Sequence, residues 1–406
     1  MSKLTSKLTL LVLPDGPISF DGSNYKYSKG ERLYLDNLAK DFKEVQLATF
    51  VLRDGDEFFE SVLHSSFNSK NIKIIELPGP RFKYPGVIMK AFQFLKVFIR
   101  LLFVMRHVDV CYLFLPSYPS ALAWGASKIW RKPHIVYGAD DWVQASESMF
   151  RWKKKKHSFF YKAYAKLNEK MERSIVRTAA FGVAAGGQLV EKYQSFGCAS
   201  YPTTPRMTLS PRDIYEREDT CLGDYVELIN VGGLIHDKAQ DQLLKSFAIA
   251  LKQHKNLKLK LIGEGPEKEN LILLAKNLSI TSKVNFVGYV EEESVLYDYL
   301  HNADVFVLSS VTEGFPRVLY EAMCMRLPIV TTNVGGIPYL MKHNKNALIV
   351  KSGDIEQLAD AICNIVQDSD LRRRLIREGS RTLDTAFGNI DSSQISKLLK
   401  LHFVSN

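Results

Sequence analysis

The chain has 406 residues, of which 46% are hydrophobic and 24% charged, the composition of an ordinary globular protein. At about 150 residues per domain this length predicts two or three domains, and it excludes disorder or collagen as a description of the whole chain. The 54 Lys and Arg residues exceed the 44 Asp and Glu residues, and the net charge of +10 favours an anionic partner: nucleic acid, anionic lipid or a phosphorylated substrate.

The first apolar run, Leu8–Leu13, predicts a buried strand. It is too short for a signal peptide, and no small-residue cleavage site follows it. Pro14–Ser28 is expected to be a long loop. Further strands are expected at Val45–Val51, Ile72–Leu77, Val108–Leu115, His134–Tyr137 and Ala180–Ala184, with helices at Glu31–Phe42, Tyr118–Trp130 and Lys162–Arg177.

An apolar and basic stretch, Pro85–Arg106, lies between two of these strands. Its polar residues Lys90, Gln93, Lys96 and Arg100 fall within about 120° of one helical face, and the remaining apolar arc is wider than on an ordinary surface helix. Interior charges argue against a membrane span. Two interpretations of helix 86–106 stay open: a helix lying in a membrane interface, and a core helix whose lysines extend to solvent.

A basic run, Lys153–Lys156 with His157, follows further along the chain. Anionic lipid is favoured over nucleic acid as its partner, because no nucleic-acid-binding motif accompanies it. A solvated run of charge is the common alternative.

The second half repeats the alternation of strands and helices. Strands are expected at Val226–Val231, Lys258–Ile262, Val284–Val287, Val305–Leu308, Pro328–Thr331 and Ala347–Val350, with helices at Gln240–Lys252, Lys268–Asn277, Glu292–Leu300 and Arg317–Met325. Continuous apolar strands between helices predict parallel sheets covered on both faces. A proline-rich and then charged segment at 201–224 predicts a linker.

The expected fold class is therefore α/β, with two doubly wound, Rossmann-like domains facing across a cleft. Their expected ranges are 1–205 and 206–380, followed by a helical C-terminal tail, 381–406, that packs back toward the first domain. In such folds ligands bind beyond the carboxyl ends of the strands.

The segment from Ser309 to Met323 is the most informative of the chain. It follows a buried strand and opens a helix, with Pro316 suited to the first helical turn and Gly314 permitting close approach of a ligand. The first-turn N–H groups, Phe315 through Val318 with Arg317 between them, predict an anion site suited to a diphosphate. Glu313 and Glu321 are placed to reach sugar hydroxyls.

This motif, E-G-F-P-x-V-L-x-E-A-M, and the following L-P-I-V-T-T-N-V-G-G-I-P resemble the retaining glycosyltransferases of family four, also called group one, which have the GT-B fold. The resemblance is strong over about 225–375 and mostly architectural before that. It implies that Glu313 holds the donor sugar through its hydroxyls and that Glu321 binds the ribose of the nucleotide.

A second segment, Asn230–Lys238, is similar to the V-G-R-L…K segment of that family. The resemblance implies that the loop at Gly232 and Gly233 contacts the donor and that Lys238 balances the charge of its diphosphate, which agrees with the need for a fixed cation beside a departing phosphate. The family has an arginine where Gly233 stands, so the clamp is expected to be weaker, with Arg317 or His236 as partial replacements.

Further loops carry weaker signals. Gly263 begins a G-x-G loop that is similar to the family's loop after the second strand, and Gly288 follows the third strand, where the family contacts the base. Tyr339 stands where the family usually has a glutamate, which weakens any inference about the donor contacts of that loop.

The N-terminal half is expected to bind the acceptor. The resemblance implies a glycine-containing loop against the donor diphosphate, with Gly30 or Gly16 as its point of close approach, and a residue touching the donor sugar after the strand that ends at Tyr137. Asp140 and Asp141 are the candidates, with Asp141 preferred; an N-cap role is the alternative.

No metal is expected. Asp54-Gly55-Asp56 spells a D-x-D pattern, but Asp-Gly is a turn signal. No cluster of His, Cys, Asp and Glu has the spacing of a metal site. The cysteines have no C-x-x-C pair and are typical of reduced thiols in a cytoplasm: Cys111, Cys198, Cys221, Cys324 and Cys363.

The resemblance implies a metal-independent, retaining glycosyltransferase without a cofactor, which uses a UDP- or GDP-linked sugar as co-substrate. A saccharide or lipid-linked acceptor, as in lipopolysaccharide or capsule assembly, and a cytoplasmic location on the inner face of the plasma membrane are expected; nucleic acid is not. Two alternatives stay open: another reaction of the same fold, such as a phosphorylase or a sugar-nucleotide epimerase, and a non-catalytic assembly subunit.

Overall fold

The computed structural model describes residues 5–14, 16–56, 65–79, 86–143, 146, 159–203, 214–314, 316–389 and 393–404. The chain divides into two units, each described by itself: unit 1 contains Met1–Thr208 and Asn389–Asn406, and unit 2 contains Leu209–Gly388. The sequence placed the divisions near 205 and 380. The second of these positions lies within one continuous helix, α13 (Ser369–Asn389).

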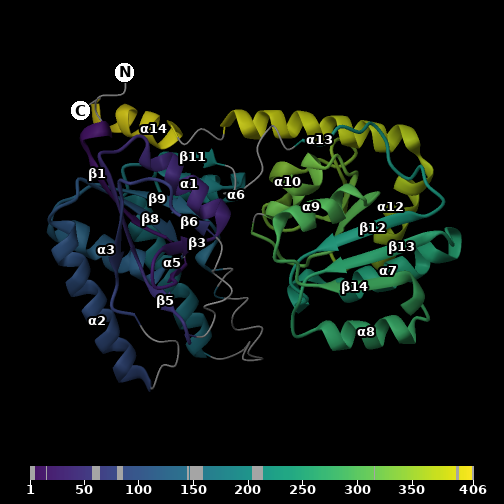
Figure 1. Ribbon diagram of the computed structural model, residues 1–406, viewed down its shortest axis with the longest axis horizontal. Helices are drawn as coiled ribbons and strands as arrows, with labels where there is room; N and C mark the ends of the chain where they lie inside the picture. Colours follow the sequence, from purple (N-terminus) through teal and green to yellow (C-terminus); the bar gives the residue numbers. More distant parts are fainter. Residues whose placement is uncertain are drawn as a thin grey trace. The chain divides into compact units, whose positions relative to one another are not determined.

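Unit 1 is built on a parallel sheet in the order β11-β10-β9-β8-β1-β4-β7. Its strands are β1 (Thr9–Leu13), β4 (Glu44–Thr49), β7 (Ile72–Glu76), β8 (Val110–Leu115), β9 (His134–Gly138), β10 (Gly182–Ala185) and β11 (Ser200–Thr203). Its helices are α1 (Lys29–Ala39), α2 (Gly86–Met105), α3 (Tyr118–Ile129), α5 (Phe159–Arg177), α6 (Gly187–Ser195) and α14 (Ser393–Val404), with a 3₁₀ turn η1 at Thr5–Lys7 (Figure 1).

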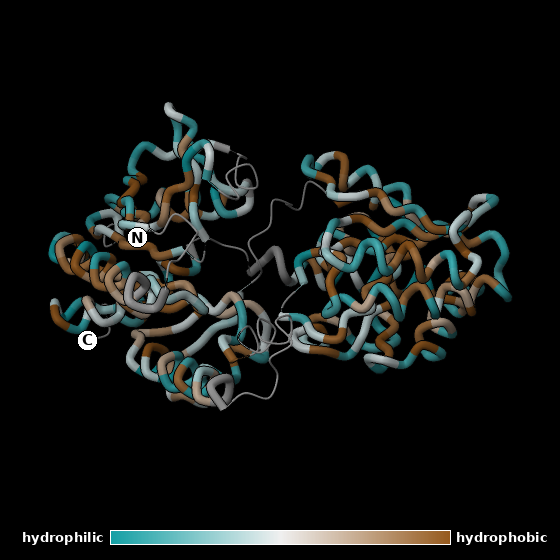
Figure 2. The backbone as a smooth tube through the Cα atoms, turned by 90° about the horizontal axis from the view of Figure 1, so that it is seen from below, coloured by the Kyte–Doolittle hydropathy of each residue, from teal (hydrophilic) through white to brown (hydrophobic). Residues whose placement is uncertain are grey.

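The sheet of unit 1 is buried on both faces, which explains the continuous apolar runs. Along β1, Leu11 and Leu13 join the core that contains residues of α2 and α3, whereas Leu10 and Val12 join the core that contains residues of α1 and α14. In Figure 2 the hydrophobic parts of the tube run through the interior of each unit.

The C-terminal helix α14 belongs to unit 1. His402 stacks on Phe181 and contacts the hydroxyl of Tyr201 at 3.1 Å, and Ser396 donates a hydrogen bond to Asp41. The helix therefore covers the sheet near β11.

The prediction of a long loop at Pro14–Ser28 is wrong in part, because this segment contains two short strands. They are β2 (Ile18–Phe20) and β3 (Tyr25–Tyr27), which pair with β5 (Val51–Arg53) and β6 (Ser65–Ser66) in the order β5-β2-β3-β6. Ile18 and Tyr27 are buried, and Gly22 turns the hairpin at φ +94°. The predicted strand Val45–Val51 accordingly splits at Phe50 between two sheets.

The segment expected to begin the linker also contains a strand. Residues Ser200–Thr203 form β11 at the edge of the sheet, where Pro202 is tolerated because an edge strand leaves one row of its N–H groups unpaired. The linker residues 204–213 lie outside the described residues.

Unit 2 has a second parallel sheet in the order β14-β13-β12-β15-β16-β17. Its strands are β12 (Val226–Val231), β13 (Leu257–Ile262), β14 (Val284–Gly288), β15 (Val305–Leu308), β16 (Ile329–Thr332) and β17 (Leu348–Val350). Its helices are α7 (Gln240–Gln253), α8 (Lys268–Asn277), α9 (Glu293–His301), α10 (Arg317–Cys324), α11 (Ile337–Leu340), α12 (Ile355–Gln367) and α13, with 3₁₀ turns η4 (His236–Lys238) and η5 (Thr281–Lys283).

Both sheets consist of parallel strands, so the loops after each strand collect at one edge. The strand order of unit 2 places the loops after β12 and β15 next to each other, with those of β13 and β16 on either side. Among the described helices of the whole chain, none has the length and apolar character needed to cross a membrane.

Candidate functional site

The loops after β12 and β15 bring Lys238 and Glu313 together. The Nζ atom of Lys238 lies 2.6 Å from Oε1 of Glu313, and their side chains are 25% and 6% exposed. Residues 75 positions apart in the sequence thus form one partly buried ion pair at the carboxyl edge of the sheet. A cation and a carboxylate are presented together at the place where α/β folds bind ligands.

Two serines at the end of β15 hold this pair. Ser310 donates its hydroxyl hydrogen to Oε1 of Glu313 at 2.6 Å, and Ser309 donates to the carbonyl of Lys238 at 2.9 Å. Sequence reasoning assigned neither serine a role. The sequence signal that could have found these serines is a pair of hydroxyl residues directly after a predicted strand. Such a pair is common in proteins, so it supported no prediction.

A glycine loop supports Glu313 from the other side. Gly335 has φ +52°, and a Cβ atom there would lie 1.6 Å from the carbonyl oxygen of Glu313. The N–H of Gly336 donates to the carbonyl of Gly314 at 3.0 Å, and Thr332 donates to the carbonyl of Ser310 at 2.6 Å. Position 335 therefore requires glycine, because any side chain would displace the backbone that carries Glu313.

The loops after β12 and β13 pack backbone against backbone. A Cβ atom at Gly263 would lie 2.1 Å from the carbonyl oxygen of Gly232, so this glycine is a steric requirement. Gly233 is different, because a Cβ atom there would have its nearest neighbour 3.8 Å away. A larger residue fits at Gly233 without strain, although its carbonyl accepts a hydrogen bond from Gln240 at 3.0 Å.

Helix α10 begins beside Glu313. Pro316 is the residue before the helix, not in its first turn as the sequence suggested; either place suits proline, because its missing N–H would have no helical partner. Arg317 is exposed and Val318 half-buried, and both belong to the first turn. Phe315 lies outside the described residues.

Glu321 lies on the second turn of α10. Burial raises the pKa of its carboxyl group to about 7, with a lowering effect of Arg317 and a further raising effect of Glu293. Nothing in the sequence indicated that Glu293, at the start of α9, would act on Glu321. A carboxyl group of this kind exchanges its proton near neutral pH.

In unit 1, Asp141 belongs to a partly buried charge cluster. The Nζ atom of Lys192 lies 2.7 Å from Oδ2 of Asp141 and 2.7 Å from Oε2 of Glu172, which is fully buried. Oδ1 of Asp141 accepts the N–H of Val143 at 2.8 Å. Both oxygens of Asp141 therefore have partners in the protein.

The ammonium group of Lys192 forms ion pairs with two carboxyl groups, those of Asp141 and Glu172. Burial and, to a lesser degree, Asp141 raise the pKa of Glu172 to about 7 against the opposing effect of Lys192. Sequence reasoning missed both residues, since Glu172 is one of many charges on the predicted helix Lys162–Arg177 and no element was predicted around Lys192.

The remaining candidates of unit 1 carry less information. Gly16 follows β1, and its carbonyl accepts the hydroxyl of Thr49 at 2.9 Å; a Cβ atom there would make an ordinary contact. Gly30 is buried in the first turn of α1. Asp140 accepts the N–H of Asp141 at 2.8 Å. Among the described residues, no group of three or more His, Cys, Asp or Glu side chains is arranged to hold a metal ion.

The sequence of unit 2 matches a known family. Residues 215–382 match the model of the family described as glycosyl transferases group 1, which supports placing this part of the chain in that family. The Lys238–Glu313 pair, the glycine loops and α10 all lie within the matched residues.

Curated relatives align over part of their length. An uncharacterized glycosyltransferase of Haemophilus influenzae is 32% identical over 40% of this chain and 45% of its own. The capsular polysaccharide biosynthesis glycosyltransferase CapM of Staphylococcus aureus is 28% identical over 64% of this chain and 60% of its own. In both cases the chain spans less than two thirds of the relative.

A solved structure matches both units. HepE of Anabaena, determined in complex with UDP, superposes with a TM-score of 0.67 at 17% identity, covering 98% of this chain and 100% of its own. The chain therefore has the fold of two Rossmann-like parallel-sheet domains known as GT-B.

Proposed function

We propose that this chain is a glycosyltransferase that moves a sugar from a nucleotide-sugar donor to a saccharide acceptor. The observation that carries the proposal is the pair of Lys238 and Glu313, 2.6 Å apart at the carboxyl edge of the sheet in the part of the chain that matches group 1 glycosyl transferases. The chain's alignments with glycosyltransferases of capsule and lipopolysaccharide synthesis support the same class of product.

In this proposal unit 2 binds the donor. Lys238 and the N–H groups at the start of α10 hold the diphosphate, Glu313 accepts hydroxyls of the sugar, and Glu321 accepts hydroxyls of the ribose. When the donor enters, its phosphate replaces Glu313 as the partner of Lys238. Ser310 then keeps Glu313 in place, because its hydrogen bond to Oε1 does not depend on the lysine.

The chemistry needs a fixed positive charge. Breaking the bond between the anomeric carbon and the phosphate oxygen leaves negative charge on the nucleoside diphosphate, and a cation in a site shielded from water stabilises that charge. The acceptor hydroxyl attacks on the same face, so the anomeric configuration is retained. The leaving oxygen takes the proton, and Lys238 supplies the positive charge without a metal ion.

The acceptor belongs to unit 1 in this proposal, with Gly16 and Gly30 as candidate contacts of the acceptor and the phosphate. Asp141 remains the candidate catalytic residue that touches the donor sugar. Because the oxygens of Asp141 are engaged by Lys192 and Val143, a sugar hydroxyl would have to share or displace one of these partners. The acceptor is proposed to be lipid-linked, and the enzyme to act in the cytoplasm on the inner face of the plasma membrane.

A thermal-shift panel tests the donor site. Wild type and Lys238→Ala are each heated with UDP, GDP, ADP and CMP and their common sugar conjugates. A nucleotide at 100 times its Kd should stabilise the wild type by about 2.7 kcal/mol and leave the variant unchanged. UDP is a principal candidate because HepE, which shares the fold, was crystallised with it.

The outcomes separate the alternatives. Stabilisation by one nucleotide in wild type alone identifies the base. Release of free sugar phosphate, or epimerised donor without acceptor, would instead identify another reaction of the same fold. Absence of any response, in the presence and absence of lipid vesicles, would favour a non-catalytic subunit.

A further inference from the structure

Helix α2 of unit 1 exposes large apolar side chains to solvent. Phe92, Leu95, Ile99 and Phe103 are 52%, 52%, 44% and 68% exposed. They recur at intervals of three and four residues, so at 100° per residue they occupy an arc of about 80° on one side of the helix. Such a stripe is unusual on a solvated surface.

The same helix buries its opposite side in unit 1. Val97, Leu101, Val104 and Met105 are buried in the core of unit 1, and at 100° per residue their arc is centred nearly 180° from the exposed stripe. Phe94 packs on Tyr118 of α3. The core-helix interpretation is thus correct for one face only, and the apolar side chains of the other face are exposed.

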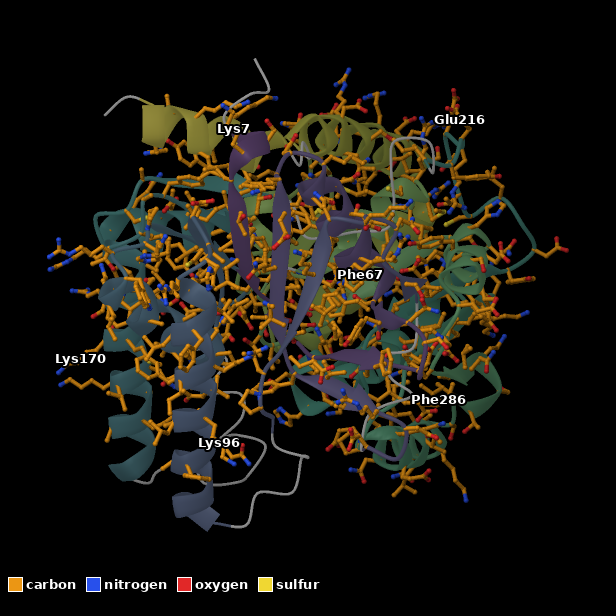
Figure 3. All side chains as sticks on the ribbon, turned by 60° about the vertical axis from the view of Figure 1, so that its left-hand side comes forward. Lys7, Phe67, Lys96, Lys170, Glu216 and Phe286 are labelled. Carbon is orange, nitrogen blue, oxygen red and sulfur yellow. The ribbon has the colours of Figure 1, made fainter. Side chains whose placement is uncertain are left out.

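The charged residues of α2 itself are all basic. The sequence of α2 contains Lys90, Lys96 and Arg100 and no acidic residue. Lys96 lies over the ring of Phe92 at 4.5 Å, and Arg100 is exposed one turn further along. Figure 3 shows Lys96 extending from α2.

We infer that this face of α2 docks in the plane of an anionic lipid bilayer. Phe92, Leu95, Ile99 and Phe103 enter the boundary between headgroups and acyl chains, while Lys96 and Arg100 remain at the level of the phosphates. The inference rests on the proposed function and extends it, because it names the face of the protein that docks on the membrane that holds the lipid-linked acceptor.

Charge complementarity decides between a bilayer and a second copy of the chain. A twofold contact through this stripe would place Lys96 and Arg100 of one copy near those of the other, with no acidic residue on α2 to balance them. An anionic membrane supplies the opposite charge, and each basic residue near its surface strengthens binding about fivefold. The net charge of +10 acts in the same direction.

Vesicle flotation tests the inference without donor or acceptor. The full chain is mixed with vesicles of phosphatidylcholine alone, or of equal parts phosphatidylcholine and phosphatidylglycerol. We expect wild type to float with the anionic vesicles only, and the binding to weaken as salt is raised. The triple variant Phe92→Ser, Leu95→Ser, Phe103→Ser should bind at least tenfold more weakly, and Lys96→Gln with Arg100→Gln about 25-fold more weakly.

The matched control changes three other exposed leucines: Leu222→Ser, Leu273→Ser and Leu401→Ser. It should float like wild type. Thermal unfolding of all variants establishes that they are folded, which is expected because the replaced side chains are exposed.

Failure of wild type to bind anionic vesicles, or undiminished binding of the triple variant, would overturn the inference. A dimer in sedimentation that the triple variant abolishes, without vesicle binding, would assign the face to a second copy. Since the assay reads binding alone, these results are independent of the nucleotide panel and of transferase activity.

Discussion

Replacement of Glu321 by glutamine should change how stability depends on pH. The folded protein holds the pKa of Glu321 at about 7 against 4.5 for the free side chain. Because the folded-state value is the higher one, the folded state favours the proton. The stability contribution of this group is complete below pH 4.5 and is lost as the pH rises through 7.

The size of the effect follows from the shift. At about 1.4 kcal/mol for each pH unit, the difference between 4.5 and 7 amounts to about 3 kcal/mol of stability lost between pH 4.5 and pH 8.5. Glutamine resembles the protonated acid and does not ionise. Glu321→Gln should therefore match wild type at pH 4.5 and exceed it by up to about 3 kcal/mol at pH 8.5.

The two units can be followed separately. The four tryptophans, at positions 124, 130, 142 and 152, all belong to unit 1. In urea unfolding without ligand, tryptophan fluorescence reports unit 1, and far-UV circular dichroism reports both. The gain from Glu321→Gln should appear in the circular dichroism transition at pH 8.5. Parallel pH profiles of wild type and variant would refute the assignment of this proton to Glu321.

Three further predictions concern the two sites. Gly335→Ala should lower the stability of unit 2 by more than about 2 kcal/mol in urea unfolding, since its Cβ would meet the carbonyl of Glu313. The control Gly353→Ala, at φ +87° with open space around it, should lose only about 1 kcal/mol. Lys192→Met removes the cation that Asp141 and Glu172 share and should destabilise unit 1 by about 3–5 kcal/mol. Tryptophan fluorescence measures the unfolding of this variant and of the exposed control Lys170→Met. Equal effects of the two substitutions would show that the cluster contributes nothing to stability. Gly233→Arg restores the arginine of the family at a position that has room for it, and it should tighten nucleotide binding about tenfold. Calorimetry measures the binding, and an unchanged or weaker affinity would mean that the arginine side chain does not reach the diphosphate.

The regular elements could be predicted from the sequence because parallel strands buried on both faces give continuous apolar runs. The run 226–231 is an example: it became β12 with the predicted bounds. The small sheet of β2, β3, β5 and β6 could not be found, since strands of two or three residues have no periodicity of their own. Strand β11 was not predicted because it contains Pro202, and proline is compatible with a strand only at the edge of a sheet. The position of a strand within its sheet depends on tertiary structure.

The candidate site was predictable to the extent that its residues share one motif. Glu313 and Glu321 stand eight positions apart, and Lys238 was found through a separate segment; their roles stay predictions. The hydrogen bond from Ser310 to Glu313 lies within one loop, whereas the cluster of Asp141, Glu172 and Lys192 joins residues from different elements. The partners in this cluster are set by how α5 and α6 pack near the end of β9, and the spacing of residues along the chain does not reveal that packing.

Sugar transfer itself is the central claim, and one assay addresses it. The nucleotide sugar selected by the thermal-shift panel is incubated with the chain and a bacterial lipid extract, and release of nucleoside diphosphate is measured with and without the extract. We expect release that depends on the acceptor in wild type and a rate at least about 100-fold lower in Glu313→Gln. Equal rates for the two proteins, or release that does not depend on the extract, would contradict the claim.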